Sequence, residues 1–131
     1  MPIKVIVDSN FLLAPAQLQI DIFEGVSELL GRKIEFVIPS PVYDELKSLS
    51  KRGEKMRMEA SLALKLAEKC KIIDVKLREN ENVDDLIVRL AIEWNCPVAT
   101  NDRELKRKLR KRGIPIIFVR EMKRIQLEGE V

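Results

Sequence analysis

The sequence of 131 residues contains no histidine, and its scarce residue types narrow the range of functions. Without histidine, the chain lacks the commonest acid and base at neutral pH and the usual nitrogen ligand of zinc and iron sites. Aromatic residues make up 5% of the chain, so extensive stacking on nucleic acid bases is not expected. No apolar run approaches the roughly 18 residues that a membrane helix needs, which predicts a protein that does not cross a membrane.

Cysteine occurs at Cys70 and Cys96, which form no Cys-x-x-Cys pair and lie in apolar surroundings. Buried free thiols are therefore expected in preference to a disulfide. There are only five glycines and no Pro/Gly/Ser-rich linker, so a single domain spanning 1–131 is expected. The chain opens almost directly with an apolar segment, so we expect no secretory signal and a cytoplasmic location.

Short apolar runs alternate with longer amphipathic stretches, a pattern typical of βα units built on a parallel sheet. The short runs predict strands at residues 3–7, 34–38, 71–75, 98–100 and 114–119. The stretches between them predict helices at residues 16–30, 41–49, 55–70, 83–94 and 103–111. The expected fold is α/β, a three-layer α/β/α sandwich with a central parallel sheet of about five strands.

Four acids stand just past predicted strands or on the first turns of predicted helices: Asp8, Glu45, Asp84 and Asp102. Ligands of an open parallel sheet gather at the carboxyl ends of its strands, so Asp8 and Asp102 should face one crevice. Two carboxylates about 5 Å apart repel by ~3 kcal/mol at an effective dielectric near 20, so the cluster favours a bound cation. Carboxylate oxygens are the hard ligands that Mg²⁺ and Mn²⁺ prefer.

Helical geometry favours one member of each pair of adjacent acids. At 100° per residue, Asp84 lies at the margin of the apolar stripe of the predicted helix 83–94, whereas Asp85 falls on its outer side. Glu45 likewise borders the apolar stripe of its helix, and Asp44 faces outward. Glu45 and Asp84 are therefore the favoured ligands, and Asp85 stays open as an alternative to Asp84.

Each acid also has an ordinary structural explanation. Asp8 could belong to a turn or cap a helix, and Asp102 could cap the helix that follows it. Asp84 could complement a helix dipole, and Glu45 could be a solvated surface acid. These alternatives stay open for each residue taken singly, but four acids converging on one sheet edge favour a metal site.

Four segments, in order along the chain, resemble the motifs of PIN domains. Residues 5–10 resemble the opening strand of that family, 39–46 its second acidic motif, 83–87 the third and 99–102 the fourth. Residues 99–119 look most like the ribosomal-RNA-processing branch, the small-subunit processome type of archaea and eukaryotes. Toxins of toxin–antitoxin pairs are the nearest rival.

The resemblance implies a metal-dependent endoribonuclease that cuts single-stranded or precursor RNA in ribosomal RNA processing. It assigns catalysis and the binding of Mg²⁺ or Mn²⁺ to Asp8, Glu45, Asp84 and Asp102. Supporting roles go to Ser9, Asn10, Thr100 and Asn101. The alternatives are a toxin-type ribonuclease with an antitoxin partner and a PIN fold that binds RNA without cleaving it. The family resemblance also allows a homodimer and a ribosome-assembly partner.

The predicted helix 103–111 and the residue after it carry seven cations opposed by the single acid Glu104. A solvated helix would usually mix its charges more evenly, so we expect an RNA backbone to contact it. The contacting residues are expected to be Arg103, Lys106, Arg107, Lys108 and Arg110. The alternative is a solvated helix with Leu105 and Leu109 buried.

Two other folds place an aspartate after the first strand. Phosphoacceptor receiver domains need paired acids early in the chain and a lysine after the last strand, which are not found here. Haloacid-dehalogenase-like phosphatases need a second aspartate two residues after the first, and that position is Asn10. Both are disfavoured.

Overall fold

A computed structural model describes residues 2–131, with the side chain of Met122 excepted. Its strands are β1 (Ile3–Val7), β2 (Ile34–Pro39), β3 (Lys71–Ile73), β4 (Val98–Ala99), β5 (Ile116–Arg120) and β6 (Arg124–Glu128). Its α-helices are α1 (Ser9–Leu18), α2 (Ile22–Leu30), α3 (Ser40–Leu49), α4 (Glu54–Ala67), α5 (Val83–Trp94) and α6 (Arg103–Lys111). A short 3-10 helix, η1 (Glu121–Lys123), joins the last two strands.

The strands form one sheet in the order β3-β2-β1-β4-β5-β6. All neighbours are parallel except β5 and β6, which pair antiparallel. The chain moves outward from β1 to β3 on one side and then returns to place β4 on the other side of β1. Ligands of such doubly wound sheets bind where the strand order reverses, which here is the carboxyl end of β1 and β4.

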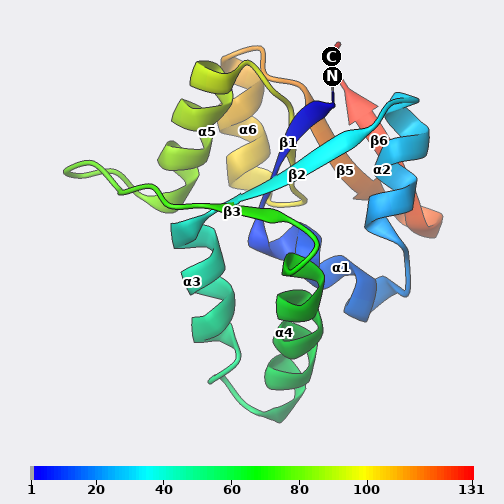
Figure 1. Cartoon of the computed structure of the whole chain (residues 1–131), viewed down its shortest axis with the longest axis vertical. Helices are drawn as coiled ribbons and strands as arrows, with labels where there is room; N and C mark the ends of the chain where they lie inside the picture. Colours follow the sequence, from blue (N-terminus) through cyan, green and yellow to red (C-terminus); the bar gives the residue numbers. More distant parts are fainter. Residues whose placement is uncertain (1) are drawn as a thin grey trace.

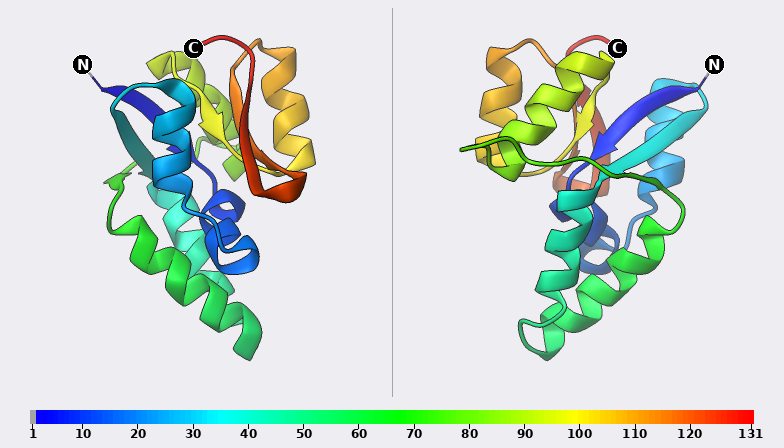
Figure 2. Two further views of the ribbon diagram at one scale, coloured as in Figure 1. Left: turned by 90° about the vertical axis from the view of Figure 1, so that its right-hand side faces the viewer. Right: turned by 60° about the vertical axis from the view of Figure 1, so that its left-hand side comes forward.

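Helices cover both faces of the sheet, as Figures 1 and 2 show. Helices α5 and α6 lie side by side on one face, and α2 lies on the other face against β6. Helices α1, α3 and α4 pack together at the end of the sheet where β1 and β2 finish. The three-layer α/β/α architecture predicted from the sequence is therefore confirmed.

The central strands end in apolar residues because both faces of the sheet are covered there. Val5, Ile6 and Val7 of β1 are fully buried, as are Val98 and Ala99 of the neighbouring β4. Parallel strands buried in this way read as continuous apolar runs rather than as alternating ones. The short central strands therefore hold a fixed position for the residues that follow them.

The predicted single helix 16–30 is wrong. The first helix begins at Ser9, directly after its N-cap Asp8, and it runs through Pro15. Gln19 ends it in the left-handed conformation with a φ of 54°, and Asp21 then caps α2 by accepting a hydrogen bond from the amide of Glu24. An aspartate followed by a glutamate three residues later is a signal for a helix start.

The sheet also contains a sixth strand that the sequence analysis did not predict. β6 adds an antiparallel edge to β5, from the pair Ile116 and Glu128 to the pair Arg120 and Arg124. The remaining predicted elements agree with the structure to within a few residues. Cys70 and Cys96 are free thiols, and none of the helices of the described chain is long and apolar enough to span a bilayer.

Candidate active site

Asp8 and Thr100 meet at the carboxyl ends of the adjacent strands β1 and β4. The side chain of Asp8 is 4% exposed and that of Thr100 is fully buried. The Thr100 hydroxyl donates to Oδ2 of Asp8 at 2.8 Å and accepts from the amide of Asp102 at 3.0 Å. One hydroxyl therefore ties together the segments that carry the first and the last predicted acid.

The residues that follow Asp8 hold its carboxylate from the other side. The amide of Ser9 donates to Oδ1 at 2.9 Å, and Nδ2 of Asn10 donates to Oδ2 at 3.0 Å. Oδ1 of Asn10 in turn accepts from the amide of Asn101 at 2.9 Å. Asn101 uses its own side chain elsewhere, accepting from the amide of Val119 on β5 at 2.8 Å. Of the predicted supporting residues, Asn101 thus braces the strand and does not point its side chain at Asp8.

Glu45 reaches the same place from α3. The Ser9 hydroxyl donates to Oε1 of Glu45 at 2.6 Å, although the two residues are 36 positions apart. Asp44, the residue before Glu45, instead faces solvent and pairs with Lys47 at 3.4 Å. Glu45 thus lies on the side of α3 that meets Ser9, and Asp44 lies on the solvent side.

The charges of the predicted acids act on the pKa values of Asp8 and Asp84. Burial raises the pKa of Asp8 to about 7, against the hydrogen bonds from Thr100 and Ser9, and the charges of Glu45 and Asp84 raise it further. Burial also raises the pKa of Asp84, with the charge of Asp102 as the next cause and that of Glu45 behind it. Asp8, Glu45, Asp84 and Asp102 are hereafter called the acidic cluster.

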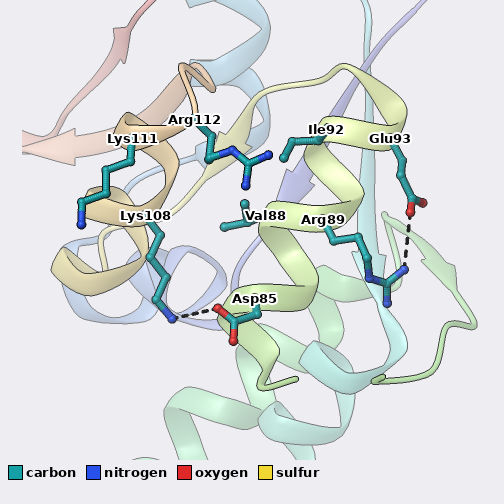
Figure 3. Close-up of a pocket in the computed structure, with 8 residues that line it drawn as sticks. All are labelled: Asp85, Val88, Arg89, Ile92, Glu93, Lys108, Lys111 and Arg112. Carbon is teal, nitrogen blue, oxygen red and sulfur yellow. Dashed lines mark hydrogen bonds and ion pairs between the residues drawn. The ribbon is translucent and has the colours of Figure 1, made fainter. Parts of the chain in front are cut away.

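Asp85 is not a member of the acidic cluster, and it forms an ion pair with Lys108 of α6 at 3.0 Å. Figure 3 shows this pair at the mouth of a groove between α5 and α6. Lys108 also lies close enough to Asp84 to lower its pKa, against the larger effect of burial. A cation of α6 that lines the groove thus pairs with the acid next to Asp84.

The donor set of the acidic cluster fits a hard divalent cation by its chemistry, because it consists of carboxylates flanked by hydroxyl and amide oxygens. As the side chains stand, no three acids among the described residues are close enough together to enclose a metal ion. The carboxylates already have partners within the protein: Glu45 accepts from the Ser9 hydroxyl, and Asp102 accepts from the amide of Leu105 in α6. Mutual repulsion without a cation also holds carboxylates apart.

The predicted RNA-binding helix does not present its cations on one face. Leu105 and Leu109 are fully buried, and the cations divide between the two flanks of α6. Lys108 faces α5, Arg110 pairs with Glu128 of β6 at 2.6 Å, and Arg107 pairs with Glu104 of its own helix at 2.8 Å. Lys106 lies over the ring of Phe118, and Arg103 is exposed.

The sequence analysis missed the hydrogen bond between Ser9 and Glu45 and the approach of Lys108 to Asp84. Both depend on how helices pack over the sheet, and no local pattern in the sequence reports that packing. Thr100 was among the predicted supporting residues, at the end of the strand predicted at 98–100.

Comparison with known proteins shows which family the chain resembles. A family model described as "PIN like domain" matches residues 5–122. The protein named Ribonuclease VapC4, from Methanocaldococcus jannaschii, is 34% identical over 132 residues, which cover 98% of each chain. The rRNA-processing protein fcf1 of Schizosaccharomyces pombe is 35% identical over 121 residues, which cover 90% of this chain and 59% of that protein.

Solved structures also match. The structure described as that of the PIN domain endonuclease Utp24 superposes with a TM-score of 0.80 at 35% identity, covering 99% of this chain and 94% of that one.

Proposed function

Because the chain belongs to the PIN-like domain family, we propose that it is a metal-dependent endoribonuclease that cuts single-stranded or precursor RNA. The observation that carries the proposal is the buried carboxylate of Asp8, which shares its surroundings with Glu45 and Asp84. A fold that gathers unneutralised acids at the ligand-binding edge of its sheet favours a site for a cation.

Asp8, Glu45, Asp84 and Asp102 would hold Mg²⁺ or Mn²⁺. The bound cation would lower the pKa of a coordinated water and neutralise charge on the scissile phosphate. Thr100 and Asn10 fix the orientation of the Asp8 carboxylate through their hydrogen bonds. Ser9 performs the same role for Glu45.

The test is cleavage of a labelled single-stranded RNA by the purified chain in EDTA, Mg²⁺ or Mn²⁺. Wild-type protein is expected to cut only with the metal, and the Asp8→Asn variant is expected to bind RNA without cutting it. Asp44→Asn is the matched control, because Asp44 is an exposed acid on the same helix as Glu45. Metal-independent cleavage, or cleavage by Asp8→Asn at the wild-type rate, would contradict the site.

The RNA that the protein cuts depends on which of two branches of the family it belongs to. Relatives named for rRNA processing and for the VapC ribonucleases match this chain at nearly equal identity. We favour rRNA precursor processing, because of the likeness of residues 99–119 to that branch. A ribosome-assembly partner or an antitoxin would accompany the respective activities, and a homodimer remains a prediction.

Expression in a living host separates the branches. A toxin-type ribonuclease arrests growth when expressed without its partner, and Asp8→Asn relieves the arrest. A processing enzyme is tolerated and cuts a structured precursor RNA in preference to a generic single strand. A chain that binds RNA but never cuts it in any metal would be a scaffold.

A further inference from the structure

The groove between α5 and α6 has a volume of about 550 Å³. That is within the range of roughly 300–1,000 Å³ found for small-ligand sites. Figure 3 shows Val88 and Ile92 of α5 on one side and Lys108 and Arg112, at the end of α6, on the other. Val88 is 9% exposed, but Ile92 is 45% exposed, so the groove has an open apolar wall.

Some basic side chains of this groove pair with acids, and others do not. Arg89 is held by Glu81 at 2.9 Å and pairs with Glu93 at 3.7 Å, which neutralises its charge. Lys108 pairs with Asp85, and both side chains are partly exposed, at 31% and 45%. Within the described chain, Lys111 and Arg112 have no acidic partner. The groove thus offers two uncommitted positive charges beside an apolar wall, a combination that fits a phosphate joined to a base.

The groove begins one residue away from the acidic cluster on α5. Asp85 and Lys108 line the groove and form an ion pair at 3.0 Å, and Asp84, the residue before Asp85 in α5, belongs to the cluster. Lys111 and Arg112 lie three and four residues after Lys108. A rise of 1.5 Å per helical residue places them roughly 5 Å further along the axis of α6. An RNA strand that extends from the acidic cluster along α6 would therefore enter the groove.

We propose that this groove is a nucleotide subsite of the RNA strand, where a base packs on Val88 and Ile92 and the adjoining phosphate contacts Lys111 and Arg112. This inference rests on the proposed ribonuclease function and gives the direction in which the substrate leaves the acidic cluster. Lys108 is the link between the two, because a partly exposed ion pair with Asp85 is weak enough for a phosphate to replace the carboxylate. The other flank of α6, with Arg110 tied to Glu128, lies outside the subsite.

Two groups of variants test the two halves of the subsite. K111Q/R112Q removes the uncommitted cations, and K33Q/K65Q is the control, because it removes the same charge from exposed lysines elsewhere on the surface. I92S removes part of the apolar wall without changing charge, and I92A repeats this change without adding a polar group. Thermal unfolding of each variant establishes that it is folded.

Binding of a labelled single-stranded RNA is measured in the Asp8→Asn background with Mg²⁺ over a series of salt concentrations. Neutralising one cation that binds a phosphate of a single strand lowers the slope of log affinity against log salt by about 0.7, so K111Q/R112Q is expected to reduce it by about 1.4. I92S and I92A are expected to weaken binding roughly fivefold at an unchanged slope, the order expected when about one methylene group is no longer buried. K33Q/K65Q is expected to leave both quantities unchanged.

An equal slope for K111Q/R112Q and its control overturns the subsite, as does wild-type affinity in both Ile92 variants or no RNA binding at all. In that case a groove of this composition would serve another partner. Failure of the proposed function gives a different result. Wild-type protein would then bind RNA with the predicted groove effects but show no metal-dependent cleavage.

Discussion

Replacement of Asp8 by asparagine is expected to stabilise the metal-free protein at neutral pH although it removes a residue of the site. Asp8 is buried, and its pKa is raised from its ordinary value of 3.8 to about 7 by burial and by the neighbouring acids. At 1.36 kcal/mol per pKa unit, the folded state carries a cost of about 4 kcal/mol once Asp8 is ionised. Asparagine carries no charge, so this cost disappears.

The pH dependence has a definite sign. Between pH 3.8 and about 7 the unfolded chain ionises Asp8 while the folded chain keeps it protonated. The unfolded state then binds fewer protons, so the stability of the wild type falls as the pH rises through this window and is level above it. The Asp8→Asn variant lacks this fall.

Asparagine also has a cost of its own. Both oxygens of Asp8 accept hydrogen bonds, and the amide group of asparagine can replace only one of them as an acceptor. The loss is about 1 kcal/mol, so Asp8→Asn should be less stable than wild type near pH 4 and more stable by about 3 kcal/mol near pH 8. For a domain of this size that gain is a rise of about 10 °C in the unfolding midpoint.

Thermal unfolding in EDTA across pH 4–8 measures this crossover, with Asp44→Asn as the control that should show none. Added Mg²⁺ or Mn²⁺ should raise the midpoint of the wild type and leave that of Asp8→Asn unchanged. A variant that is destabilised equally at every pH would refute the reasoning, because it would mean that Asp8 carries no buried charge.

Two further predictions concern the surroundings of the site. Thr100→Val should destabilise the protein by about 1–3 kcal/mol, because Asp8 loses a donor and the amide of Asp102 loses an acceptor. The loss should be larger at pH 8, where Asp8 is ionised, than at pH 5. Urea unfolding at both pH values measures this difference, and an equal loss of stability would contradict it. Glu81→Gln should free the loop before α5, because the hydrogen bond from Arg89 lowers the pKa of Glu81 to about 2. That stabilisation is present above pH 4.5 and lost as the pH falls toward 2, so limited proteolysis should distinguish variant from wild type only at the higher pH.

The sequence predicted that the segments after the strands at 3–7 and 98–100 lie at one edge of the sheet, because parallel strands impose this arrangement. Asp8 follows one central strand and Thr100 follows its neighbour, so sheet topology alone brings them together. Helical periodicity favoured Glu45 over Asp44 and Asp84 over Asp85 as ligands, and that choice stays a prediction. These inferences needed only the strand ends and the angle of 100° per residue.

The sequence could not predict interactions that depend on packing between elements. The sequence predicted one helix from residue 16 to residue 30, yet α1 begins at Ser9 and runs through Pro15, and a separate helix starts at Ile22. β6 is a short edge strand whose pairing with β5 is not visible in its own five residues. The pairing of the cations of α6 was not visible either, because Lys108 meets Asp85 on one flank and Arg110 meets Glu128 on the other.

The ordinary and the functional explanations of the acids are compatible in this fold. Asp8 accepts from the first amide of α1, and Oδ1 of Asp102 accepts from the amide of Leu105 in α6, so each acts as a helix cap. Asp84 lies in the first turn of α5. Three acids therefore stand at helix N-termini, where the partial positive charge of the helix favours a carboxylate. Capping is thus one way in which the fold tolerates a cluster of like charges before any cation arrives, and it fixes the backbone from which those carboxylates extend.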